Sequence, residues 1–230
     1  MGLPCYLAMT AAEFSSAMPP QVAYMACHFS SSSDGLSNLP EHLPENAMVI
    51  LDDSTPFDGH DPSRIREELE AAIKSHRCKY LLLDLQRPKD EKVTALCDLL
   101  VQALPCPVIV SEVYAEARSC PVFVSPPPLL TPLSDHLAPW EGREIWLEAA
   151  LDRQVGMVTE TGASRFPCVD TDLPEPWFLE ESLFCRYHWA LEGRTARFTI
   201  LRTKNELAAM LDGAEAFGVK GAVGLYQELQ

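Results

Sequence analysis

Three short apolar runs, each closed by carboxylates, recur along this chain about thirty residues apart. They occupy positions 48–53, 80–84 and 108–112. Such spacing is typical of strand-helix units in a parallel sheet, in which the carboxyl ends of the strands share one edge. The sequence therefore predicts an α/β fold with its acidic residues gathered at one face.

Further strand-like segments bring the number of predicted barrel strands to eight. They begin near residues 3, 22, 48, 80, 108, 121, 197 and 222. Amphipathic helices follow the third and fourth strands, the first of them starting at Asp61-Pro62, and a capping box of Thr203 and Glu206 opens a last helix. The first helix is expected to be stunted or absent. These features predict a TIM-like (β/α)8 barrel with some helices reduced. An open doubly wound sheet is the alternative, although no glycine-rich dinucleotide motif follows any strand.

Residues 141–195 interrupt the alternation of strands and helices. Within them, β-like segments follow one another without intervening helices and are joined by turns such as Glu192-Gly193. We expect this stretch to form a β-rich insertion before the last helix. The chain as a whole, 1–230, is expected to be a single barrel domain that contains it.

Composition narrows the class of partner. The 33 acidic and 18 basic residues give a net charge of -15, which disfavours nucleic acid and anionic membranes. No apolar run is long enough to span a bilayer, and the chain does not start like a signal peptide. Eight scattered cysteines without a Cys-x-x-Cys pair indicate core residues in a reducing compartment. We expect an acidic cytoplasmic protein with a small-molecule or carbohydrate ligand. No cofactor is predicted, and the oligomeric state is left open.

The loops that follow the strands of a barrel carry its active site, so position nominates the candidate residues. Asp52, Asp84 and Glu112 are the predicted catalytic residues, since converging carboxylates suit glycosidic chemistry. The predicted substrate-binding residues are Asp53, Gln86, Tyr114, Tyr226 and Glu228.

The third strand, the helix after it and the next two strands resemble a reduced form of the glycoside hydrolase family 18 barrel, the chitinase-like family. The fourth-strand signature of that family ends in Asp-x-Glu, and the similar stretch here is Leu82-Leu83-Asp84-Leu85-Gln86. The β-rich insertion is similar to the small α+β subdomain of many of those enzymes. This resemblance implies a carbohydrate ligand at the carboxyl ends of the strands.

One departure from the family bears on catalysis. Gln86 stands where the resemblance places the proton-donating glutamic acid, and an amide cannot deliver that proton. If the protein hydrolyses its ligand, Glu112, Glu116 or Glu228 is expected to be the acid, with Glu112 preferred. Asp84 would then stabilise positive charge while Gln86 holds the substrate. If it does not, the protein is a degenerate member that only binds.

Two other function classes stay open. One is a non-catalytic binding or interaction protein that works through its acidic surface or the insertion. The other is a metal-dependent hydrolase with ligands among His28, His60, Asp61, Asp52 and Asp53, although helix capping explains His60 and Asp61 equally well. The sequence leaves open whether the protein is an enzyme, and any activity is expected to be that of a glycosidase-like hydrolase.

Overall fold

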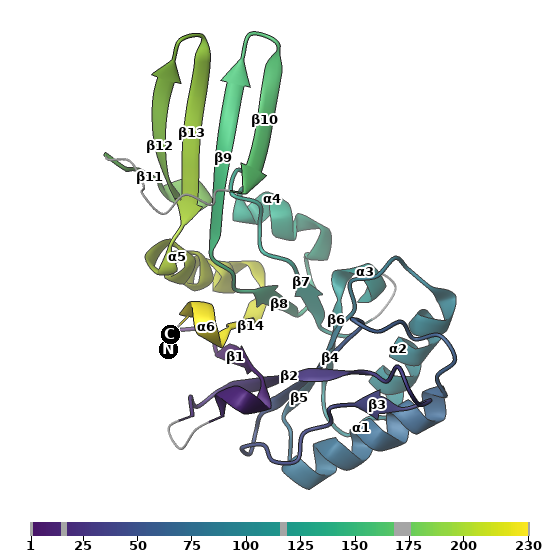
Figure 1. Cartoon of the computed structure of the whole chain (residues 1–230). Coiled ribbons are helices and arrows are strands. Elements are labelled where there is room, and N and C mark those ends of the chain that lie inside the picture. Colours follow the sequence, from purple (N-terminus) through teal and green to yellow (C-terminus); the bar gives the residue numbers. More distant parts are fainter. Residues whose placement is uncertain (1, 15–17, 116–118, 168–175, 230) are drawn as a thin grey trace. The chain divides into compact units, whose positions relative to one another are not determined.

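The chain divides into two compact units, which we describe one at a time (Figure 1). The computed structural model describes residues 2–14, 18–115, 119–167 and 176–229. The barrel unit comprises Leu3–Ser125, Gly142–Glu148 and Gly218–Gln230. The inserted unit comprises Met1–Gly2, Pro126–Glu141 and Ala149–Phe217.

The barrel unit is a closed ring of eight parallel strands, counted over the residues that the structure describes. The strands are β1 (Cys5–Met9), β2 (Val22–Phe29), β4 (Met48–Asp52), β5 (Tyr80–Asp84), β6 (Val108–Ser111), β7 (Val122–Val124), β8 (Ile145–Glu148) and β14 (Val219–Leu225). Each strand pairs with the next in this order, and β1 closes the ring by pairing with both β14 and β2. A two-residue antiparallel strand, β3 (Leu36–Ser37), pairs with the end of β2. The predicted TIM-like barrel is confirmed.

The helices of the barrel unit are reduced, as expected. The long ones are α1 (Pro62–His76) and α2 (Glu91–Ala103), and α1 starts at the predicted cap, where the Asp61 carboxylate accepts a hydrogen bond from the Ser63 amide at 2.9 Å. The described part of the connection after β1 contains one turn, η1 (Ala11–Glu13), closed by a capping box. Both α3 (Glu112–Ala115) and α6 (Tyr226–Leu229) contain four residues.

Alternate residues of each strand fill the barrel interior, as the period of a strand requires. The interior cluster consists of Tyr6, Ala8, Ala23, Met48, Ile50, Leu82, Ile109, Phe123, Trp146 and Val223. The Trp146 ring contacts those of Tyr80 and Tyr6, with centroids 4.8 and 5.8 Å away. Gly221 of β14 gives this ring its space, since a Cβ there would lie 2.6 Å from a Trp146 ring atom. The interior is thus a packed core up to the level where the strands end.

The seventh barrel strand differs from the prediction. The strand expected near residue 197 is β13 (Thr195–Arg202), which pairs antiparallel with two other strands of the inserted sheet. The barrel position belongs instead to β8, which pairs in parallel with β7 and β14. Spacing misled the prediction because β13 directly precedes the last helix, whereas β8 is a four-residue strand directly before the inserted strands. The inserted sheet runs from residue 152 to 202, whereas the predicted insertion spans 141–195, a range that contains β8 and ends at the first residue of β13.

The inserted unit is built on a five-stranded antiparallel sheet in the order β10-β9-β13-β12-β11. Its other strands are β9 (Asp152–Thr159), β10 (Gly162–Pro167), β11 (Phe178–Glu180) and β12 (Cys185–Glu192). The helical elements of this unit are α4 (Leu133–Leu137), η2 (Ala138–Trp140), η3 (Glu181–Leu183), α5 (Lys204–Ala214) and η4 (Glu215–Phe217). The predicted capping box is present at the start of α5, where Thr203 and Glu206 bond reciprocally.

A buried arginine holds the base of the inserted sheet. Arg202 is 2% exposed, and its guanidinium donates to the carbonyl oxygens of Pro127, Phe184 and Leu183 at 3.0, 3.3 and 3.5 Å. Burial lowers the pKa of Arg202 from its ordinary value, an effect partly opposed by Asp152. The three carbonyls satisfy the buried donors, so the charge ties separate segments of the unit together.

The cysteines of the described residues are free thiols, and five of them are buried. These five are Cys27, Cys78, Cys97, Cys120 and Cys185. Cys168 lies outside the described residues. No helix within the described ranges is long and apolar enough to cross a membrane.

Candidate functional site

Carboxylates continue the inward-facing rows of the barrel core at the carboxyl ends of three strands. Tyr80 and Leu82 are followed on the same face by Asp84, and Met48 and Ile50 are followed by Asp52. These two acids are register partners in the pairing of β4 with β5. In β8, Trp146 is followed in the same way by Glu148. The alternation therefore directs Asp52, Asp84 and Glu148 towards the mouth of the barrel.

Asp84 is one of the three acids predicted to be catalytic. Burial raises its pKa above the ordinary value, and the neighbouring carboxylates of Asp52 and Asp53 raise it further. The Gln86 amide opposes this shift, because its Nε2 donates a hydrogen bond to Asp84 Oδ1 at 2.5 Å. Asp84 and Gln86 thus form a contacting pair at the end of the fourth barrel strand.

Glu148 is a site residue that the sequence analysis missed. Burial raises its pKa, and the charges of Asp84, Glu228 and Glu112 each raise it further. Three other acids therefore act on Glu148, one at the end of β5 and two in the short helices that follow β6 and β14. The signal was present in the sequence, since Ile145-Trp146-Leu147-Glu148 repeats the pattern of an apolar run closed by an acid. It was overlooked because this segment was assigned to the insertion.

Glu112 lies at the start of α3, directly after β6, and not at the end of the strand as the apolar run suggested. Its carboxylate accepts hydrogen bonds from Ser125 Oγ at 2.7 Å and from the Ser125 amide at 3.3 Å. Ser125 therefore holds the Glu112 carboxyl group through two hydrogen bonds. Glu116 lies outside the described residues.

Asp53 braces two loops. Its buried carboxylate accepts hydrogen bonds from the backbone amides of Gln86 and Arg87, at 3.1 and 2.8 Å, and Arg87 Nε donates to its carbonyl oxygen at 2.6 Å. The Asp52 carboxylate accepts from the Ser54 amide at 2.8 Å. The structure therefore separates the adjacent acids, with Asp52 in the row that leads to the mouth and Asp53 between the loops after β4 and β5.

The two predicted tyrosines have different surroundings. Tyr114 is 1% exposed, and its hydroxyl donates to the Pro88 carbonyl at 3.1 Å. It lines a cavity outside the barrel interior together with Phe29 and Phe57. Tyr226 is half-buried in α6, two residues before Glu228. In that same turn, Gln227 Nε2 donates to Glu13 Oε1 at 2.9 Å, which joins the loops after the last and first strands. Both tyrosines thus lie in four-residue helices that also carry an acid, Glu112 or Glu228, but Tyr114 is buried and Tyr226 is half-buried.

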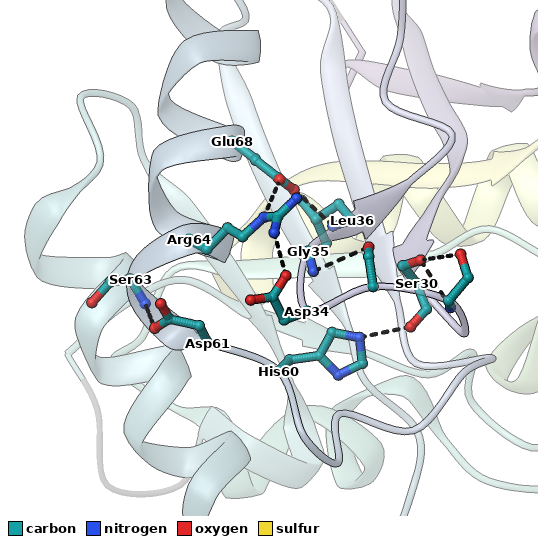
Figure 2. A network of polar contacts seen from close by, with 11 residues as sticks. Ser30, Asp34, Gly35, Leu36, His60, Asp61, Ser63, Arg64 and Glu68 are labelled. Atoms are coloured by element: carbon teal, nitrogen blue, oxygen red, sulfur yellow. Dashed lines mark hydrogen bonds and ion pairs between the residues drawn. The ribbon is translucent and has the colours of Figure 1, made fainter.

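The residues nominated as metal ligands make contacts of their own. Figure 2 shows His60 and Asp61 in a polar network that joins the loop before β3 to α1. Both ring nitrogens of His60 face carbonyl oxygens, those of Phe57 at 2.7 Å and Ser30 at 2.8 Å. His28 Nδ1 lies 3.1 Å from the Ala26 carbonyl. Within the described ranges, no three or more His, Cys, Asp or Glu side chains are grouped to hold a metal ion.

The same network fixes the loop that precedes β3. Arg64 of α1 forms ion pairs with Asp34 and with Glu68, the second at 2.9 Å, and Glu68 accepts from the Leu36 amide at 2.7 Å (Figure 2). A side chain at Gly35 would collide with the Glu68 carboxylate at 2.5 Å. The polar residues around Asp34-Gly35 therefore have a structural role, because they attach the loop before β3 to α1.

The fold of this chain is similar to that of several solved structures, whereas its sequence matches no known family. No family model and no curated protein matches the chain. The spore cortex-lytic enzyme SleL of Bacillus cereus matches with a TM-score of 0.63 and 8% identity, over 99% of this chain and 71% of that one. A chitinase from Chromobacterium violaceum matches with a TM-score of 0.57 and 10% identity, over 96% and 93%. SleL of Bacillus megaterium matches with a TM-score of 0.52 and 9% identity, over 97% and 70%. At such identities the likeness shows the fold, a barrel similar to that of chitinase and cortex-lytic enzymes.

Proposed function

We propose that the protein binds a carbohydrate at the carboxyl ends of its barrel strands and that Asp84 and Glu148 can act on a glycosidic bond there. The observation that carries the proposal is that both side chains continue the inward-facing rows of their strands and that burial and neighbouring carboxylates raise both pKa values. A pair of carboxyl groups in which one retains its proton can supply a general acid and a charged partner.

Glu148 suits the acid role better than Glu112, because Glu148 continues the inward-facing row of β8 after Trp146, whereas Glu112 lies in α3 and is bonded to Ser125. In the proposed reaction, the Glu148 proton passes to the glycosidic oxygen while the bond from that oxygen to the sugar carbon breaks and its electron pair leaves with the oxygen. The Asp84 carboxylate stabilises the positive charge on the sugar carbon. Water then adds to that carbon and returns its proton to Glu148. Gln86 positions Asp84 through the Nε2 contact.

A second candidate function is binding without hydrolysis. The observation that favours it is the Asp84-Leu85-Gln86 ending of the fourth barrel strand, where an amide replaces the acid that the family resemblance implies. In that case the same carboxylates would accept hydrogen bonds from sugar hydroxyls and no bond would break.

The test uses the full chain and two probes chosen after the names of the structural neighbours, chitohexaose and purified peptidoglycan. Affinity is measured by calorimetry and hydrolysis by the release of reducing ends, in the wild type and in Asp84→Asn, Glu148→Gln and Glu67→Gln. Glu67 lies on the outer helix α1 and is the matched control.

Hydrolysis that Glu148→Gln removes, while Glu67→Gln retains it, supports catalysis. Binding weakened by Asp84→Asn without any hydrolysis supports the second candidate. Equal affinity of all four proteins for both probes, or the absence of any binding, contradicts the mouth of the barrel as a carbohydrate site.

A further inference from the structure

The inserted sheet presents one side rich in aromatic and aliphatic side chains. Cross-strand partners point to the same side of a sheet, so the register places Phe178 beside Tyr187 and Trp189 beside Phe198 on one side. The rings of Phe178 and Tyr187 are stacked with centroids 5.5 Å apart. We call this side the aromatic face, and its members are Phe178, Tyr187, Trp189, Leu191, Phe198 and Val158.

The outer part of the aromatic face is open in the described structure. Near the base of the sheet, Ile200 and Cys185 are buried against Leu129. Tyr187 and Phe198 are partly buried against this cluster, and beyond them Trp189 is 51% exposed and Leu191 68% exposed. An exposed tryptophan in the middle of an apolar sheet face usually marks a binding surface.

A polar hollow is lined by residues on the same side of the inserted sheet. Asp152, Gln154 and Arg165 line it, and Gln154 Nε2 donates to Asp152 Oδ2 at 3.0 Å. In the sheet register, Gly156 stands between Arg165 and Phe198. Because Gly156 has no side chain, no third side chain lies between Arg165 and Phe198 on this side of the sheet. A Cβ at this position would meet both neighbours at 3.9 Å, which is ordinary contact.

This combination matches the chemistry of a sugar chain. A pyranose ring presents C–H groups on its faces and hydroxyls around its edge, so it stacks on aromatic rings and bonds to planar polar groups. Tyr187 and Trp189 are two residues apart on β12, a spacing of about 7 Å along a strand, on the scale of one sugar residue. The net charge of -15 disfavours a nucleic acid as the stacking partner.

We propose that the aromatic face and its polar hollow form a second glycan-binding surface, built from residues of the inserted unit alone. The rings stack on the sugar faces, and Asp152, Gln154 and Arg165 bond to the hydroxyls. The ligand class rests on the proposed function, but the site does not, so the two can fail independently.

Two substitutions and one matched control test the surface in the full chain. Trp189→Ala removes the exposed ring, and Gly156→Leu fills the gap beside Phe198 at a backbone position without strain. Leu179→Ala is the control, because Leu179 is 54% exposed and alternates to the other side of β11. Chitohexaose and cellohexaose are titrated by calorimetry, circular dichroism checks the fold, and sedimentation gives the oligomeric state.

The expected result is that each face variant weakens binding of at least one probe by about tenfold or more, as removing a central tryptophan contact commonly does, while Leu179→Ala does not. Asp84→Asn separates the two sites: binding that it alone abolishes overturns this inference and leaves the barrel proposal standing. Absence of binding by the wild type also overturns it. A dimer that Trp189→Ala dissociates overturns it in favour of a contact between copies of the chain.

Discussion

The glycine that accommodates Trp146 allows a sharp prediction about the barrel core. A methyl group at Gly221 would lie 2.6, 2.8 and 2.9 Å from Cζ3, Cη2 and Cε3 of the Trp146 ring, closer than carbon atoms approach without displacement. The ring is 1% exposed and is held by Tyr80 and Tyr6, so it has little room to move. We expect Gly221→Ala to lower the free energy of unfolding by about 1–3 kcal/mol, the usual range for overpacking.

Urea unfolding followed by near-ultraviolet circular dichroism measures this change, since the clustered rings contribute to that signal. With a slope of about 3 kcal/mol/M, the unfolding midpoint should fall by roughly 0.3–1 M. Gly156→Ala is the control, because its new Cβ meets no atom closer than 3.9 Å. The three crowded atoms belong to the six-membered part of the indole. The loss in Gly221→Ala combined with Trp146→Phe should therefore be smaller than the sum of the single losses, by about 1 kcal/mol. A wild-type midpoint for Gly221→Ala, or strict additivity, would refute the reasoning.

Three further predictions concern polar groups. Asp53→Ala leaves the amides of Gln86 and Arg87 without their acceptor and should lower the free energy of unfolding, measured by thermal unfolding, by about 1–3 kcal/mol. Asp58→Ala, at an exposed residue nearby, is the control and should change it little. Equal losses in the two variants would contradict the role of Asp53 in joining the two loops. The pKa of Glu148 is raised in the folded state above its ordinary value of 4.5, so ionisation of Glu148 destabilises the fold as pH rises past that value. Glu148→Gln should therefore be more stable than the wild type at pH 7, with a gain that vanishes below pH 4.5. A gain in stability that does not change with pH would contradict the raised pKa. Arg202→Met leaves three carbonyls without their donor and should lower the stability of the inserted unit by about 2–4 kcal/mol. Hydrogen exchange of its strands measures this loss, and unchanged exchange would contradict the role of Arg202 in holding the base of the sheet.

Local sequence patterns correctly predicted strands that are marked by a continuous apolar run. The runs at β4 and β5 were placed at their observed bounds, and the caps at Asp61 and Thr203 begin helices as expected. The position of β8 was not predictable from spacing, because membership of a ring depends on parallel pairing with β7 and β14, which lie far apart in the sequence. Strand signals identify segments, while the sheet that each segment joins is decided by long-range contacts.

The candidate site shows the same division. Asp84 followed from its place after an apolar strand, and the fold puts it at the mouth. Glu148 was not predicted as a site residue, because its place at the mouth depends on β8 being a barrel strand. The different positions of the Asp52 and Asp53 side chains could not be predicted from the sequence either. The position of Asp53 depends on hydrogen bonds from two backbone amides that lie more than thirty residues later in the chain. Position along a strand predicts a carboxylate at the mouth, whereas its hydrogen-bond partners require the folded loops.

The pairing of β1 with β14 has a consequence for the order in which the chain acquires structure. These strands lie at residues 5–9 and 219–225, so the ring cannot close on the ribosome before the last strand has emerged. The five inserted strands lie within 152–202 and can pair earlier. Until synthesis reaches β14, the edges of β1 and β8 that it later covers have unpaired backbone groups. The nascent barrel is therefore the stage at which this chain most needs protection from aggregation.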